Sequence, residues 1–190
     1  MQKLVFTFLF LFMGFAALQA QIARVQIIHN APEPTVDVYA NGEILLDDFR
    51  FRTATPFVDI PAGVNIRLDI APASSTSAAD AIASFDATFE ENRTYIVTAS
   101  GLVGGSPGFG LNIFDAAREA AADPDQVDVA VLHGSPDAPA VDVDATFVAN
   151  DVVKNLEFGQ FTGYLSLPAG KYDLAVRATG DPNVVASFRA

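Results

Sequence analysis

The sequence carries the same pattern twice, and this internal repeat constrains the fold more than any other feature. The segment "RVQIIHNAPEPTVDV" (residues 24–38) matches "DVAVLHGSPDAPAVDV" (residues 128–143) with one residue missing. Further along, both copies contain a "PAG" turn, which ends at Gly63 and at Gly170. Because the matches keep the same order, they indicate a tandem duplication in which one structural unit is built twice.

Each copy is predicted to consist of short β-strands. Val25 and Ile27 alternate with polar neighbours, which is the period of a strand with one buried face. The pair Asn41-Gly42 lies between two apolar runs and is a strong hairpin signal. Short strands at intervals of about 8–12 residues, with turn signals between them, are typical of a β-sandwich. The predicted fold is therefore all-β, with two tandem immunoglobulin-like β-sandwich domains.

The repeat also sets the predicted domain boundaries. They are a signal peptide at 1–20, a first sandwich at 23–114, a short helical connector at 115–126 and a second sandwich at 127–190. The connector is predicted to contain a two-turn helix because Asp115 can cap it and Pro124 can stop it.

The second copy is shorter than the first. After its "ASFDA" segment the first copy continues with "TFEENRTYIVTASG", which has no counterpart in the second copy. The second sandwich is therefore predicted to be truncated by one or two strands. A sandwich without them exposes apolar surface and an unpaired edge, so we expect these residues to be part of a longer protein.

The N-terminal residues predict export. Lys3 precedes a long apolar run, and Ala20 precedes Gln21, which is the pattern of a secretory signal peptide. The run is shorter than the roughly 20 residues that a membrane-spanning helix needs. We expect a secreted or cell-surface protein with no membrane insertion after signal removal. The formal net charge of −12 repels phosphate backbones and argues against nucleic-acid binding.

A duplicated histidine–proline–aspartate motif is the candidate site. It contains the two histidines of the chain and the prolines and aspartates that follow them: His29, Pro32, Pro34, Asp37, His133, Pro136, Asp137, Pro139 and Asp142. By strand parity the histidines face the core, and Asp37 and Asp142 point the other way. Prolines cannot donate to a sheet ladder, so the motif predicts a rigid crossover whose unpaired main-chain groups are satisfied by the imidazole and the carboxylate. We interpret the motif as structural.

The pattern "VxxxHxSPDAPxVDV … LPAG", followed by a "YxV" strand that closes the unit, resembles the domain of unknown function 4397 family. The resemblance covers nearly the whole chain after the leader. It implies an exported, β-rich tandem module, mostly bacterial, with no assigned activity and no agreed catalytic residues. The first copy departs from the motif, because Asn30 and Ala31 stand in place of Gly134 and Ser135.

Catalysis is one alternative to the structural interpretation. A His-Asp pair beside Ser135 has the residue types of a nucleophile with its base and orienting group. However, the first copy has Ala31 at the position of Ser135, and no "GxSxG" elbow is present. The absence of cysteine excludes thiol nucleophiles, thiolate metal sites and disulfides.

Two binding roles are further alternatives. Asp137, Asp142 and Asp144 carry the oxygens that calcium prefers, but Tyr39 takes the position of Asp144 in the first copy. Sugars stack on aromatic side chains, for which Tyr39 and Tyr95 are the exposed candidates in a chain without tryptophan.

The function predicted from these features is a non-enzymatic, secreted or cell-surface structural or interaction module without cofactor or metal. Its partner is expected to be an extracellular protein or glycan. The alternative is a glycan- or protein-binding adhesion module that uses loops at one end of the sandwich. A hydrolase is the third functional hypothesis for the same residues.

Overall fold

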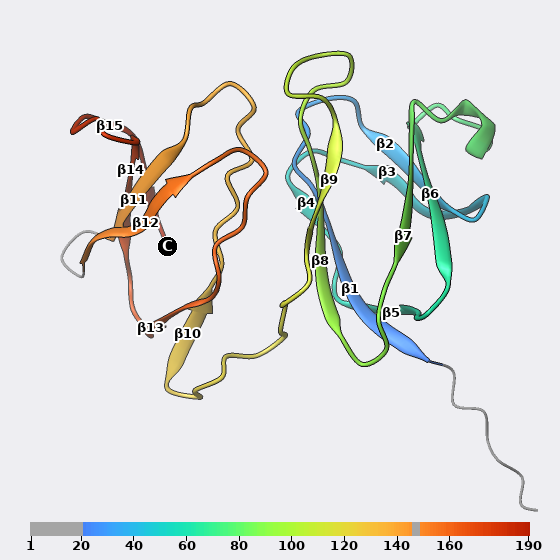
Figure 1. The fold of residues 1–190 in the computed structure, drawn as a ribbon. Helices are drawn as coiled ribbons and strands as arrows, with labels where there is room; N and C mark the ends of the chain where they lie inside the picture. Colours follow the sequence, from blue (N-terminus) through green and yellow to red (C-terminus); the bar gives the residue numbers. More distant parts are fainter. Residues whose placement is uncertain (1–20, 146–148) are drawn as a thin grey trace, which may run out of the picture.

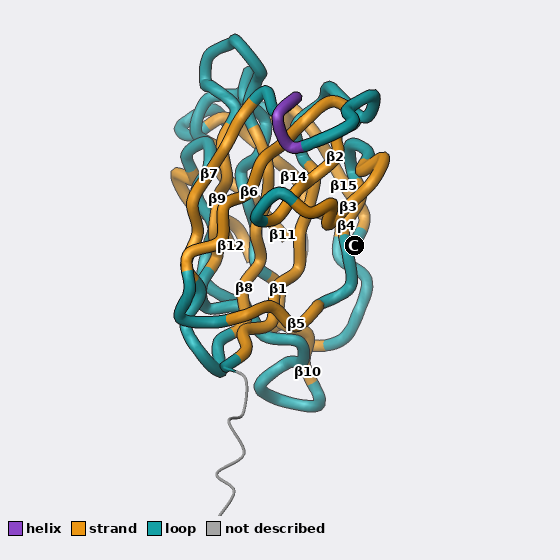
Figure 2. Tube along the Cα trace, turned by 90° about the vertical axis from the view of Figure 1, so that its right-hand side faces the viewer, coloured by secondary structure: helices purple, strands orange, loops and turns teal. Residues whose placement is uncertain are grey.

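The computed structural model describes residues 21–145 and 149–190. The predicted signal peptide, residues 1–20, lies outside the described residues. The prediction of an all-β chain is confirmed, because the helical content of the described part is one 3-10 turn, η1 (Ala78–Asp80). Figure 2 shows this turn in purple among strands and loops. No helix in residues 21–145 or 149–190 has the length and apolar character needed to cross a membrane.

The first copy forms two sheets that face each other like a sandwich. One sheet contains β1 (Ile22–His29), β4 (Thr53–Ala54), β5 (Val58–Pro61), β8 (Thr94–Ser100) and β9 (Gly110–Phe114). The other contains β2 (Val36–Ala40), β3 (Glu43–Phe49), β6 (Asn65–Pro72) and β7 (Ala83–Thr88), in the order β3-β2-β6-β7. Strand β1 is antiparallel to β4 and β5 on one edge and parallel to β8 on the other.

The core of the first copy lies between these sheets because apolar residues alternate along the strands. Val25 of β1 and Val97 of β8 pack with Ile66 of β6 in one buried cluster. The predicted hairpin turn joins β2 to β3, and both of its residues have the positive φ that such a turn requires, 51° at Asn41 and 87° at Gly42.

The second copy repeats most of this arrangement. Its larger sheet contains β12 (Ala149–Leu156), β11 (Val141–Ala145), β14 (Asp173–Ala178) and β15 (Val184–Arg189), in that order, and corresponds to β3-β2-β6-β7. Its smaller sheet pairs β10 (Gln126–Val129) with β13 (Leu165–Pro168), as β1 pairs with β5. Within the described ranges no strand of the second copy corresponds to β8 or β9. The arrangement is sandwich-like, and the finer likeness to an immunoglobulin domain stays a prediction.

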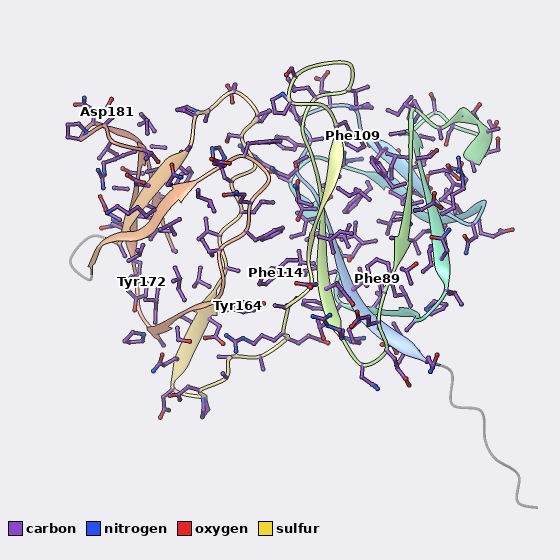
Figure 3. All side chains as sticks on the ribbon, viewed as in Figure 1. Phe89, Phe109, Phe114, Tyr164, Tyr172 and Asp181 are labelled. Atoms are coloured by element: carbon purple, nitrogen blue, oxygen red, sulfur yellow. The ribbon has the colours of Figure 1, made fainter. Side chains whose placement is uncertain are left out.

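The second copy stands beside the β8–β9 side of the first (Figure 1). Phe114, the last residue of β9, stacks on Phe161 with 5.1 Å between ring centroids and meets Tyr164 edge-on at 5.4 Å. Figure 3 shows Phe114 and Tyr164 close together between the two halves. Arg118 lies over the Tyr164 ring, 4.2 Å from its centroid. Aromatic contacts therefore hold the two copies together.

The connector does not contain the predicted helix. Residues 115–125 form turns and bends, so that prediction is wrong. An isolated helix of two turns gains too few hydrogen bonds to offset its nucleation. Tertiary contacts engage the segment instead: the Glu119 side chain pairs with Arg24 at 2.7 Å, and the main-chain amide of Arg118 donates to the Tyr164 hydroxyl at 3.1 Å.

Candidate functional site

The first histidine of the motif holds two main-chain groups. His29 ends β1 and is 1% exposed. Its Nε2 lies 3.0 Å from the Pro34 carbonyl oxygen, and its Nδ1 lies 3.3 Å from the Ala31 amide nitrogen. Because an amide N–H can only donate, Nδ1 accepts and Nε2 carries the proton given to the carbonyl. Burial lowers the pKa of the imidazole, and the bond to Pro34 opposes this shift. The neutral imidazole thus joins the two ends of the crossover loop through the Ala31 amide and the Pro34 carbonyl, and we call this arrangement a clamp.

The second histidine repeats this geometry. His133 is also buried. Its Nε2 lies 2.8 Å from the Pro139 carbonyl oxygen, and its Nδ1 accepts from the Ser135 amide at 3.3 Å. The extra residue in the second copy lies inside the loop that the imidazole spans, so both loops reach the same clamp. The main-chain amide of Ser135 therefore already occupies Nδ1 of His133. Ser135 itself is an exposed residue.

The two aspartates of the "VDV" strands hold a second main-chain feature. Asp37 accepts from the Asp48 amide at 3.0 Å, and Asp142 accepts from the Asn155 amide at 2.8 Å. Asp48 and Asn155 have positive φ, 52° and 48°, and each lies where the strand pairing changes register. Each aspartate therefore fixes a β-bulge in the neighbouring strand.

Hydroxyl groups complete the surroundings of these carboxylates. Ser75 donates to Asp37 at 2.5 Å, and Thr179 donates to Asp142 at 3.0 Å. The pKa of Asp37 is lowered mainly by the Ser75 hydroxyl, and that of Asp142 mainly by the Asn155 amide. Hydrogen bonds to the ionised form favour it, so both carboxylates stay charged although both residues are buried.

The remaining motif residues lie on the crossover loops. Pro34 and Pro136 are half-buried, whereas Pro32, Pro139 and Asp137 are exposed. The motif thus separates into two buried clamps, made by histidine and aspartate, and a proline-containing loop that carries the clamped carbonyl. The sequence indicated the residue types of the clamps but not the bulge that the aspartate holds.

The two motifs also touch each other. Asn30, next to His29, donates from Nδ2 to the Gly134 carbonyl at 3.0 Å, and a Cβ on Gly134 would lie 2.1 Å from that nitrogen. Asn112 of β9 makes the same kind of contact with Gly159, at 2.9 Å from its carbonyl. The sequence differences at Asn30 and Gly134 therefore serve the interface between the copies. In the sequence, these contacts were indicated only by the alignment of Asn30 in the first copy with Gly134 in the second.

The carboxylates considered as an alternative calcium site have other contacts in the structure. Asp144 is paired with Arg177 at 2.9 Å, Asp142 holds the bulge, and Asp137 is exposed. In the part of the chain that the structure describes, carboxylates gather instead at Asp37, Asp47 and Asp48, whose oxygens lie within 4.8 Å of one another.

Burial and the two neighbouring carboxylates raise the pKa of Asp47 in this cluster. The second copy does not repeat the cluster, since Lys154 and Asn155 occupy the positions of Asp47 and Asp48.

The two tyrosines expected to be exposed are buried, so the expectation of an aromatic sugar platform on them is wrong. Tyr39 is 6% exposed and its hydroxyl lies 2.9 Å from the Ser75 Oγ. Tyr95 is 5% exposed, packs edge-on against Phe89 and accepts from the Glu90 amide at 3.0 Å. Tyr95 stands two residues from Val97 on β8 and therefore shares its inward face, and this parity was the sequence signal for its direction.

The second copy exposes an apolar side chain, Phe188, whose counterpart in the first copy is covered. Phe188 of β15 is 60% exposed, whereas Phe85, its counterpart on β7, is half-buried against Phe109 with 6.0 Å between ring centroids. Beside Phe188 runs a cleft of about 440 Å³ between the larger sheet of the second copy and the segment that follows β10, and its lining residues include Val131 and Val176. This cleft is the core of the second sandwich, open on the side where β8 and β9 lie in the first.

Comparison with protein families gives one match. The family model described as "Domain of unknown function (DUF4397)" matches residues 23–144 and again residues 127–189, so both copies are covered. No curated protein matches the chain.

Proposed function

The chain belongs to the domain of unknown function 4397 family, and from this premise we propose that it is an exported, non-enzymatic structural and interaction module. In this proposal the first copy and the clamps supply a rigid scaffold. The second copy supplies the binding element, a sheet edge that is unpaired among the described residues and accepts an extended polypeptide strand. Export is proposed from the N-terminal leader pattern of Lys3, the apolar run and Ala20.

The clamp geometry supports a role without catalysis. A histidine that acts as a general base needs a nitrogen free to take a proton from the nucleophile. In both copies Nδ1 is occupied by an amide, and Nε2 is occupied by a proline carbonyl. The residues that resembled a triad in the sequence therefore support the backbone of the crossover.

The edge of β10 that is unpaired among the described residues carries the binding part of the proposal. In the first copy β8 lies parallel to β1, from the pair Arg24 with Thr94 to the pair His29 with Ala99. The counterpart of β1 is β10, which pairs only with β13 among the described residues. A strand that lay along β10 would repeat the β1–β8 pairing and cover the cleft, which is the mode of β-strand addition. Such a partner needs apolar residues at alternate positions, as Tyr95 and Val97 provide in β8.

A protein segment is favoured over a glycan by the chemistry of the open face. Its exposed lining residues are the apolar Val185 and Phe188 together with Ser135 and Asp137 of the crossover loop. The hydrogen-bonding groups that a strand requires are supplied by the β10 main chain. Sugars need polar side chains beside an aromatic platform, and the two tyrosines considered for that role are buried.

The test is binding of a synthetic peptide with the sequence of residues 93–101, "RTYIVTASG", to the whole chain. We expect the peptide to slow hydrogen exchange of the amides at residues 128–133, which are equivalent to residues 24–29 of the β1–β8 pairing. A control peptide with Tyr95→Asp and Val97→Asp should have no effect, because its inward face is charged. Equal effects of both peptides, or none from either, would contradict the proposal. Selective binding on a glycan array would favour the adhesion alternative.

A further inference from the structure

The first sandwich encloses a cavity that the proposed function does not use. It lies between the two sheets of the first copy and has a volume of about 330 Å³. Its walls come from both sheets and include Val25 and Val97 on one side and Val38 and Ile70 on the other. Phe89, labelled in Figure 3, is also among the lining residues. The cavity therefore lies in the middle of what would otherwise be a closed hydrophobic core.

Empty space of this size is unusual in a small domain. Protein interiors are packed as tightly as organic crystals, with few voids larger than a water molecule. The destabilisation caused by a dry void grows with its volume, and for this one it would be comparable to the whole free energy of unfolding of a small domain. Water fills such a space poorly, because each water needs at least two polar partners and the walls are almost entirely hydrocarbon.

Small side chains keep the space open. Ala40 at the end of β2 and Ala99 on β8 both line the cavity, at inward strand positions where a larger aliphatic residue would fill it. The His29 ring reaches the same cavity, but its two nitrogens are held by Pro34 and Ala31. The imidazole therefore presents no free polar group to an occupant.

The cavity opens at one edge of the sandwich. Of its lining residues, Leu45 on β3 is 40% exposed and Val64 in the β5–β6 turn is 50% exposed. Asp59 at the same edge is paired with Arg24 at 2.9 Å, so the charge of this cation is already balanced by an anion. Exposed aliphatic side chains around an entrance favour apolar molecules, and the net charge of −12 disfavours anionic ones.

We propose that the first sandwich binds one neutral, apolar small molecule between its sheets, with the β3 edge and the β5–β6 turn as the entrance. The volume is roughly twice that of an engineered 150 Å³ cavity that accepts benzene, and it falls within the range of natural ligand sites. A hydrocarbon chain or fused-ring skeleton without a charged head group fits both the walls and the entrance. This site is separate from the open face of the second copy.

The test uses N-phenyl-1-naphthylamine, a neutral apolar dye whose fluorescence rises when it leaves water, with the whole chain. Two substitutions at equivalent positions separate the two halves. Leu68 lines the cavity of the first copy, and Leu174 lines the open cleft of the second. Leu68→Trp should weaken dye binding to the cavity of the first copy at least about tenfold. Leu174→Trp should leave the affinity of that cavity for the dye unchanged.

A second variant covers the case in which Leu68→Trp fails to fold. Ala99→Leu adds a smaller group to the cavity wall, so it should both raise the melting temperature and weaken dye binding, because filling a void stabilises the core. The proposal is overturned if the unmodified chain binds no dye. It is also overturned if the loss of binding follows Leu174→Trp rather than Leu68→Trp, or if Ala99→Leu lowers the melting temperature without changing dye binding.

Discussion

Removal of either clamp histidine should destabilise the copy that contains it, while the fold of the other copy is retained. In the first copy, His29→Ala leaves the Ala31 amide and the Pro34 carbonyl without their partner. The Ala31 amide belongs to a fully buried residue and the Pro34 carbonyl to a half-buried one. A buried polar group without a partner costs about 1–3 kcal/mol, so the loss of both should come to about 3 kcal/mol.

The expected loss is large enough to measure by thermal unfolding. For a domain of 60–100 residues, 1 kcal/mol shifts the melting temperature by about 4–8 °C. His29→Ala should therefore lower the first copy's transition by at least roughly 10 °C at pH 8, where the imidazole is neutral. His133→Ala should act in the same way on the second copy, because its two hydrogen bonds are equivalent.

His29→Phe is the control that separates hydrogen bonding from packing. The phenyl ring keeps the contact that the imidazole makes with Phe49, whose centroid lies 5.7 Å away, but it cannot bond to either main-chain group. We expect it to recover only a small part of the lost stability. If His29→Phe is as stable as the unmodified chain, or if both alanine variants lose less than about 1 kcal/mol, the clamp interpretation is wrong.

Three further outcomes are expected. Since burial lowers the pKa of His29, its contribution to stability is complete above the ordinary value near about 6.5 and declines as the pH falls through the folded-state pKa; urea midpoints between pH 8 and pH 5 should fall less in His29→Phe. The lowered pKa of Asp142 predicts the corresponding behaviour at lower pH, so Asp142→Asn should unfold at lower temperature at neutral pH and converge with the unmodified chain in acid. Gly101→Ala should destabilise by more than about 2 kcal/mol, because φ is 87° and its Cβ would lie 2.2 Å from the Gly108 carbonyl oxygen, whereas Gly104→Ala, with φ of 71° and open space around the Cβ, should lose only about 1 kcal/mol; equal effects of the two would refute this steric argument.

The repeat and the strand period predicted much of the structure because both are local properties of the sequence. Alternation along residues 24–29 and the Asn41-Gly42 pair were enough to place strands and a hairpin. The pairing of His29 with a crossover carbonyl was also predictable, because prolines leave main-chain groups unpaired. These features depend on residues that are neighbours in the chain.

The remaining features depend on residues brought together from a distance. The bulge that Asp142 holds is formed by Asn155 on another strand, and no pattern within the motif specifies it. The connector segment has helix-forming residues, but Arg24 and Tyr164 engage Glu119 and Arg118 in contacts that a short helix would have to compete with. The cavity of the first sandwich depends on how far apart two sheets stand, which strand patterns do not encode.

The asparagine–glycine contacts give the pair of copies a fixed direction. Gly159 and Arg52 occupy equivalent positions, since the amide of each donates to the main-chain oxygen of its own clamp histidine. Gly159 lies so close to Asn112 that a Cβ would be 2.8 Å from the asparagine nitrogen. A chain with its halves exchanged would bring the long Arg52 side chain to that position. The first copy thus supplies the asparagines and the second copy the glycines of this interface, and exchanging the two copies would bring Arg52 to a position that has room only for glycine.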